Sequence, residues 1–193
     1  MVERIRAAFA SRLETKASCL QACVHTEFYI HDPHPVREGK GPCELLTTGA
    51  KAKSDLHVLN SSQRQLHFVA IDQCLYTDAD PSNCDCALLD GETAYFVEFK
   101  TSEHAIDPAI VVANANPGDC LDQLAASIRD FYDRGILRAG QTVMACASVG
   151  FPRNRPQSGA HFQEQLASLQ RKIEIAARPI RLRYRSESEL DIK

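Results

Sequence analysis

The sequence contains no tryptophan, and aromatic residues make up only 7% of its 193 positions. No apolar run approaches the ~20 residues that a membrane-spanning helix needs. The first residues, Met-Val-Glu-Arg-Ile-Arg-Ala-Ala-Phe, lack the apolar centre and the small-residue cleavage site of a secretory signal peptide. We therefore expect a cytoplasmic protein that does not associate with membranes.

The overall composition is equally ordinary. Hydrophobic residues account for 44% of the chain and charged residues for 24%, and the formal net charge is -3. These values are typical of a soluble globular protein and exclude a wholly disordered chain, a collagen or a disulfide-rich mini-protein. The length predicts one domain over residues 1–193.

The charges are nevertheless unevenly distributed along the chain. Residues 72–133 carry thirteen carboxylates against two basic side chains, whereas residues 150–185 carry eight basic side chains against two carboxylates. Such asymmetry is typical of proteins that bind nucleic acid or metal, although mixed charges also solvate ordinary surfaces. The near-neutral total therefore leaves nucleic acid open as a partner.

Cysteine is the one residue type with an unusual count, which is eight. In a reducing cytosol we expect thiols, not disulfides, and most of them buried. Their spacing matches no zinc-finger pattern. The cysteines are Cys19, Cys23, Cys43, Cys74, Cys84, Cys86, Cys120 and Cys146.

A group of histidines near a proline-rich segment is a further possible metal site. His25, His31 and His34 lie close to Asp32 in the sequence, but their spacing fits no metal-binding motif. The two prolines that follow favour a turn, so we interpret Asp32 as a turn residue.

Hydrophobic periodicity predicts alternating helices and strands, and therefore an α/β fold with a central mixed sheet flanked by helices. The predicted helices are residues 2–23, 120–134 and 161–177, with a helical turn at 43–47. The predicted strands are residues 24–30, 55–60, 64–77, 84–89, 93–100, 142–149 and 180–185.

The segment 84–100 gives the sharpest geometric prediction. An Asp-Gly pair between two apolar runs predicts a β-hairpin that turns at Asp90-Gly91. Side chains alternate along a strand, so Glu98 and Lys100 share one face. With a two-residue turn, Asp85 lies opposite Phe96, which is on the same face of its strand as Glu98, so all three side chains share that face. A four-residue loop also places Asp85 on that face. A three-residue loop would place Asp85 on the opposite face.

Two carboxylates and one ammonium group on one face have a clear chemical use. The oxygens of Asp85 and Glu98 suit a hard cation such as Mg²⁺, which can polarise a phosphoryl oxygen and activate water. Lys100 can position that water or neutralise charge on the phosphate. The alternative is an ordinary surface ion pair between Glu98 and Lys100.

The Asp85…Glu98-Phe99-Lys100 pattern at the end of an apolar strand resembles the PD-(D/E)xK nuclease superfamily. The resemblance covers residues 60–150 and implies a restriction-endonuclease-like αβββαβ core. It also implies that Asp85 and Glu98 bind Mg²⁺ or Mn²⁺ and that Lys100 assists the attacking water. Many members add a polar residue after the lysine strand, which here is Gln123. A glutamate from the first helix also contributes in many of them, and the candidates in this chain are Glu3 and Glu14.

Five arginines follow the predicted core, two in a loop and three on one face of the last predicted strand. They could contact a phosphate backbone, or the strand residues could protect a sheet edge from aggregation. They are Arg153, Arg155, Arg181, Arg183 and Arg185.

Together these features predict a metal-dependent nuclease that hydrolyses phosphodiester bonds of nucleic acid, with DNA as the expected substrate. A homodimer would suit double-strand cleavage, for which such folds often use two active sites. The alternative is a catalytically inactive nuclease-fold module that binds nucleic acid or a protein partner of the immunity or regulatory type. Metal-dependent cleavage distinguishes the two.

Overall fold

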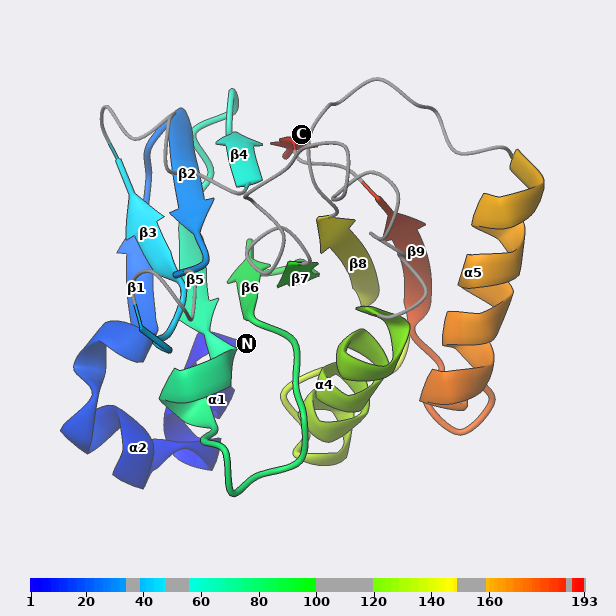
Figure 1. The fold of residues 1–193 in the computed structure, drawn as a ribbon, viewed down its shortest axis with the longest axis horizontal. Helices are drawn as coiled ribbons and strands as arrows, with labels where there is room; N and C mark the ends of the chain where they lie inside the picture. Colours follow the sequence, from blue (N-terminus) through cyan, green and yellow to red (C-terminus); the bar gives the residue numbers. More distant parts are fainter. Residues whose placement is uncertain (34–38, 48–55, 100–119, 149–158, 187–188, 193) are drawn as a thin grey trace.

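The computed structural model describes residues 1–33, 39–47, 56–99, 120–148, 159–186 and 189–192. These residues form two mixed β-sheets flanked by helices, so the α/β fold class and the central mixed sheet are confirmed (Figure 1). None of the described helices has the length and apolar character that crossing a membrane requires.

The larger sheet has six strands in the order β1-β5-β6-β7-β8-β9. The strands from β1 to β7 pair antiparallel, whereas β8 pairs parallel with both β7 and β9. The strands are β1 (Leu20–Cys23), β5 (Leu66–Ala70), β6 (Cys86–Leu89), β7 (Thr93–Phe99), β8 (Thr142–Ser148) and β9 (Arg181–Arg185).

A second, four-stranded sheet has the order β10-β4-β2-β3. Strand β2 pairs antiparallel with both β4 and β3, and the C-terminal strand β10 pairs parallel with β4. The strands are β2 (Glu27–His31), β3 (Glu44–Leu46), β4 (Leu56–Leu59) and β10 (Glu189–Asp191). The predicted helical turn at 43–47 is therefore wrong, because β3 is extended and pairs with β2.

The long helices pack beside the parallel part of the larger sheet. Helix α4 (Leu121–Asp133) contacts β7, and α5 (Gly159–Ile173) contacts β9 and α4 (Figure 1). The ring of Phe131 on α4 meets that of Phe96 on β7 edge to face, with centroids 5.1 Å apart. Both rings are fully buried, so this aromatic contact anchors α4 to the sheet.

The predicted helix over 2–23 is the largest error in the sequence-based elements. The chain instead forms α1 (Val2–Ala8), α2 (Ala10–Thr15) and a short 3₁₀ segment (Ala17–Cys19), and then pairs as β1 with β5. Tertiary pairing overrides the helical periodicity of the last residues. The predicted strand 64–77 is also shorter, because β5 ends at Ala70 and an irregular helical segment (Ile71–Leu75) follows.

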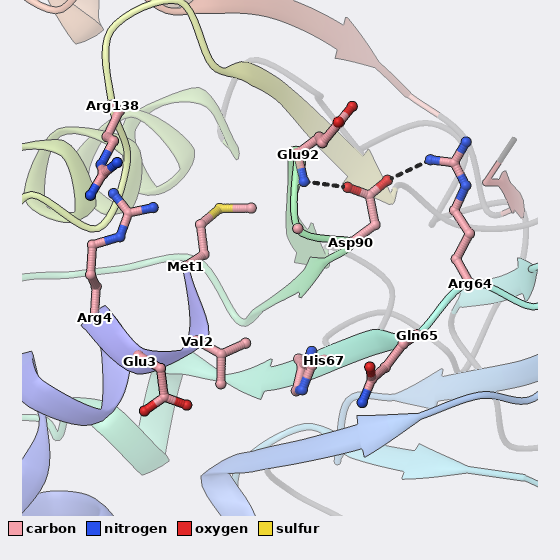
Figure 2. A pocket seen from close by; sticks show the side chains of 11 residues that line it. Met1, Val2, Glu3, Arg4, Arg64, Gln65, His67, Asp90, Glu92 and Arg138 are labelled. Atoms are coloured by element: carbon pink, nitrogen blue, oxygen red, sulfur yellow. Dashed lines mark hydrogen bonds and ion pairs between the residues drawn. The ribbon is translucent and has the colours of Figure 1, made fainter.

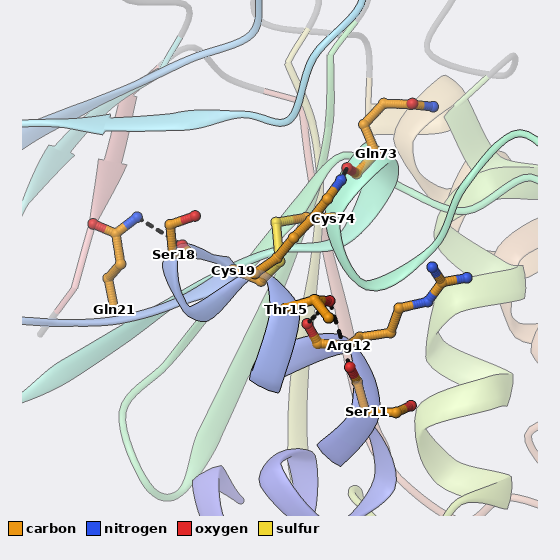
Figure 3. Close-up of a disulfide and its surroundings, with 9 residues drawn as sticks. Ser11, Arg12, Thr15, Ser18, Cys19, Gln21, Gln73 and Cys74 are labelled. Carbon is orange, nitrogen blue, oxygen red and sulfur yellow. Dashed lines mark hydrogen bonds between the residues drawn. A yellow bond between two sulfur atoms is a disulfide. The ribbon is translucent and has the colours of Figure 1, made fainter.

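A disulfide joins Cys19 to Cys74 and corrects the prediction that all cysteines are thiols (Figure 3). The two residues are 55 positions apart, and their Cα atoms are 5.6 Å apart. The bond connects the 3₁₀ segment to the irregular segment after β5, which local sequence spacing does not predict. The other cysteines are buried free thiols, as expected: Cys23, Cys43, Cys84, Cys86, Cys120 and Cys146.

Candidate functional site

The predicted carboxylate pair lies at one end of the β6–β7 hairpin. The register pairs Cys86 with Val97 and Leu89 with Ala94, which corresponds to a four-residue connection. One further step along this register sets Asp85 opposite Glu98. The backbone N–H of Phe99 donates a hydrogen bond of 2.6 Å to Oδ2 of Asp85. Asp85 therefore meets the Glu98 segment directly, and the alternative pairing of Asp85 with Phe96 is wrong.

Both carboxylates are withdrawn from water. Glu98 is 1% exposed and Asp85 is partly buried just before β6. Burial raises the pKa of Asp85 well above its usual range, and the charges of Glu98 and then Asp32 raise it further. The hydrogen bond from Phe99 N–H opposes this rise but does not cancel it. The site therefore holds negative charges that repel one another in a poorly solvated place.

Asp32 reaches this site from the second sheet, directly after β2. The Cys43 thiol lies 3.8 Å from Oδ1 of Asp32, as a weak donor. Burial raises the pKa of Cys43 well above its usual range, with further contributions from a hydrogen bond with Cys86 and from the charges of Asp85 and Asp32. The interpretation of Asp32 as only a turn residue missed this role. The contact joins two sheets, so local spacing carries no signal for it.

Helix α4 holds the segment that leads into Asp85. The Ser127 hydroxyl accepts a 2.8 Å hydrogen bond from Cys84 N–H and donates one of 3.3 Å to Oδ1 of Asn83. Gln123, one turn earlier, donates from Nε2 to the carbonyl of Asn83 at 3.3 Å. The structure thus brings Gln123 into contact with the chain two positions before Asp85, and this bond positions the chain that leads to the carboxylate. The catalytic role that the resemblance implies for Gln123 stays a prediction.

The glutamates considered from the first helix lie elsewhere. Glu3 is largely exposed and forms an ion pair of 2.6 Å with Arg6. It lines a pocket together with Asp90, which follows β6, so it lies at the opposite end of that strand from Asp85. Glu14 is an exposed residue of α2. In the described structure Asp32, not Glu3, provides the third carboxylate whose charge acts on Asp85.

The arginines of β9 occupy the outer strand of the larger sheet in the described part of the chain. Arg181 and Arg183 are exposed and Arg185 is partly buried. The intervening Tyr184 is buried against Phe162 of α5, with ring centroids 5.7 Å apart. This alternation agrees with the predicted strand pattern, and it fits both protection of a sheet edge and contact with phosphates.

Three of the predicted site residues, Lys100, Arg153 and Arg155, lie outside the described residues. Lys100 directly follows Phe99, the last residue of β7. Its proposed role therefore depends on the sequence pattern and the resemblance.

The carboxylate pair fits a hard cation by its chemistry. Among the described residues, no group of three or more His, Cys, Asp or Glu side chains is arranged to hold a metal ion. Mg²⁺, however, is usually bound through one or two carboxylates together with water and substrate phosphate. Asp85 and Glu98 supply two carboxylates whose mutual repulsion a cation would relieve.

No model of a protein family matches the chain, and no curated protein or solved structure gives a significant match.

Proposed function

We propose that this protein hydrolyses phosphodiester bonds of nucleic acid, with DNA as the substrate and Mg²⁺ or Mn²⁺ as the cofactor. The observation that carries the proposal is the placement of Asp85 beside Glu98 with a raised pKa. Buried carboxylates that repel one another cost stability and are concentrated at functional sites. A structural role would be served better by a neutral pair.

Each residue has a defined task in this proposal. Asp85 and Glu98 bind the cation, and the N–H of Phe99 fixes the orientation of the Asp85 carboxylate. When bound, such a cation polarises a phosphoryl oxygen and lowers the pKa of a coordinated water. Lys100 retains the role that the resemblance implies, which is to orient the attacking water. Gln123 and Ser127 hold the chain before Asp85 in place.

The exposed arginines of β9 are the proposed contacts to the phosphate backbone. Each bound phosphate releases about one counterion, so affinity for DNA should fall with salt concentration. Replacing Arg181 or Arg183 by Gln should reduce the slope of log affinity against log salt by about 1 for each phosphate that the variant no longer binds. A slope identical to that of the wild type would restrict these arginines to protection of the sheet edge.

The test is cleavage of plasmid, linear and single-stranded DNA with and without Mg²⁺ or Mn²⁺. Glu98→Gln and Lys100→Ala should each lose about 100-fold or more of the activity. Glu164→Gln, which removes the same charge from an exposed position of α5, is the matched control and should cut normally. Calorimetry should show Mn²⁺ binding to the wild type and weaker binding to Glu98→Gln.

Two results would overturn the proposal. One is cleavage by Glu98→Gln and Lys100→Ala at the wild-type rate, and the other is no metal binding by the wild type. Metal or DNA binding without any cleavage would instead identify the inactive nuclease-fold module as the correct alternative.

We also propose a cytoplasmic location. Disulfides are rare in the reducing cytosol, so the Cys19–Cys74 bond bears directly on this proposal. Fractionation of cells should recover the protein with cytosolic markers, and recovery only with the contents of an oxidising compartment would refute the location.

A further inference from the structure

A pocket of about 900 Å³ lies at the end of β6 that is remote from Asp85 (Figure 2). Its lining comes from the N-terminal residues, the chain around the start of β5, the β6–β7 turn and the loop after α4. The charged lining includes three arginines and three carboxylates, and His67 also lines the pocket. The arginines are Arg4, Arg64 and Arg138, and the carboxylates are Glu3, Asp90 and Glu92.

Two of the three carboxylates already have cationic or backbone partners. Oδ1 of Asp90 accepts hydrogen bonds from the backbone N–H groups of Glu92 and Thr93, at 3.1 and 2.6 Å. Oδ2 of Asp90 pairs with Arg64 at 3.1 Å, and the Asp90 side chain is fully buried. Glu3 pairs with Arg6. Asp90 therefore shapes the turn and neutralises Arg64. It does not neutralise Arg4 or Arg138, the other two arginines of the pocket.

Arg4 and Arg138 form a pair of like charges on one wall of the pocket. Figure 2 shows their guanidinium groups next to each other, on the side away from Asp90 and Arg64. Burial and the charge of Arg138 lower the pKa of Arg4. Arg4 donates from Nη1 to the carbonyl of Gly135 at 3.0 Å. The Arg138 guanidinium has no hydrogen-bond or ion-pair partner among the residues that the structure describes.

Two adjacent guanidinium groups present many N–H donors and two positive charges to the pocket. Guanidinium groups match the oxygens of phosphate and carboxylate groups in a bidentate fashion. A phosphomonoester carries about -1.5 to -2 charge at pH 7, so it balances more of the positive charge of Arg4, Arg138 and the neighbouring Met1 amino group than the single charge of a carboxylate or a phosphodiester does. The carboxylates on the other walls would repel a long polyanion, so they favour a compact ligand.

We propose that Arg4 and Arg138 bind the phosphate group of a small phosphomonoester in this pocket. The site is separate from the Asp85–Glu98 pair, because β6 lies between them, and it needs no metal ion. Its success or failure is therefore independent of the proposed nuclease activity.

The experiment measures binding by calorimetry with three probes: inorganic phosphate, adenosine 5′-monophosphate and adenosine. The first two should bind and the third should not. Arg138→Gln should weaken phosphate binding about tenfold or more, because it removes charge-assisted hydrogen bonds. Arg138 is exposed and its side chain has no hydrogen-bond partner in the described part of the chain, so this variant should fold normally.

Two further variants separate charge from geometry. Arg4→Lys retains the charge but loses the planar fork, so phosphate binding should weaken despite an unchanged net charge. Arg171→Gln, which removes one charge from an exposed position of α5, is the matched control and should bind phosphate normally. Glu98→Gln should also bind phosphate normally, which separates this site from the nuclease proposal.

Three outcomes would overturn the proposal. The first is no binding of phosphate to the wild type at millimolar concentration. The second is wild-type affinity in both Arg138→Gln and Arg4→Lys, which would place the phosphate elsewhere. The third concerns competition for the binding of inorganic phosphate. If an oligonucleotide with a 5′-hydroxyl competes as strongly as adenosine 5′-monophosphate does, the pocket is a contact for the nucleic-acid backbone.

Discussion

Removal of the Cys19–Cys74 disulfide should lower the free energy of unfolding by several kcal/mol. The bond closes a loop of 55 residues between the 3₁₀ segment and the irregular segment after β5. In the chain-entropy description, a loop of 55 residues loses about 14 cal/mol/K in the unfolded state, or about 4 kcal/mol at 25 °C. The loss of stability therefore arises mainly from the greater entropy of the unfolded chain, and less from lost contacts in the native structure.

The native structure contains other contacts that join the two bonded segments. Strands β1 and β5 pair over four residues next to the bond, and Lys16 donates from Nζ to the carbonyl of Gln73 at 3.0 Å. These interactions hold the two segments together after the sulfur–sulfur bond is broken. The variant Cys19→Ala/Cys74→Ala should consequently fold to the same structure with lower stability.

The assay is urea unfolding of the wild type and of the double variant, each with and without reductant. Reductant should lower the wild-type curve to that of the variant and leave the variant unchanged. A stability decrease of this size corresponds to a fall in Tm of about 8–16 °C for a chain of this length. Equal midpoints for the oxidised wild type and the double variant would refute the reasoning. So would an equal effect of reductant on both proteins.

Three other predictions concern the carboxylate site. Glu98→Gln removes a like charge beside Asp85 and should raise the free energy of unfolding at pH 7 by on the order of 1 kcal/mol. The pKa of Asp85 is raised in the folded protein, so protonated Asp85 contributes most to the free energy of unfolding at low pH. This contribution is lost as the pH rises from 3.8, the pKa of Asp85 in the unfolded chain, through its pKa in the folded protein. Urea unfolding at pH 3 and pH 7 should therefore show a smaller gain at the lower pH; an equal gain at both would contradict the repulsion. Ser127→Ala leaves the N–H of Cys84 unpaired and should cost about 1–3 kcal/mol, whereas Ser62→Ala at an exposed position should be neutral in the same urea assay. Protons compete with cations for Asp85, so calorimetry should find tighter Mn²⁺ binding and proton release as pH rises; an affinity independent of pH would place the metal elsewhere.

The hairpin shows how far sequence reasoning reaches in this protein. Alternation along β7 and the Asp-Gly turn predict that Asp85 and Glu98 share a face. The prediction is the same for a two-residue and a four-residue connection, because both place Asp85 on the same face of the sheet. The register selects the four-residue connection, so Asp85 lies opposite Glu98. Gly91 has a φ of 94° within this connection, which explains why glycine occupies the turn.

The failures have a common physical origin in contacts between distant segments. Residues 20–23 have the periodicity of a helix, but pairing with β5 and the bond from Cys19 to Cys74 impose a strand. Asp32 follows β2 in the second sheet, and its effect on Asp85 arises only when the two sheets meet. Single-sequence patterns report local preference, so they cannot anticipate either contact.

The two candidate sites are related by the strand that separates them. At one end of β6, Asp85 lies in a group of negative charges; beyond the other end, Arg4 and Arg138 form a pair of positive charges. Each group is destabilising when isolated, because like charges repel more strongly where water is partly excluded. The short strand β6 is itself fully buried and pairs on both sides, so it can fix both groups in place against that repulsion. The opposite signs predict opposite ligands, a cation at the first group and an oxyanion at the second. Stabilisation by Mn²⁺ should therefore disappear in Glu98→Gln and persist in Arg138→Gln, and stabilisation by phosphate should show the reverse.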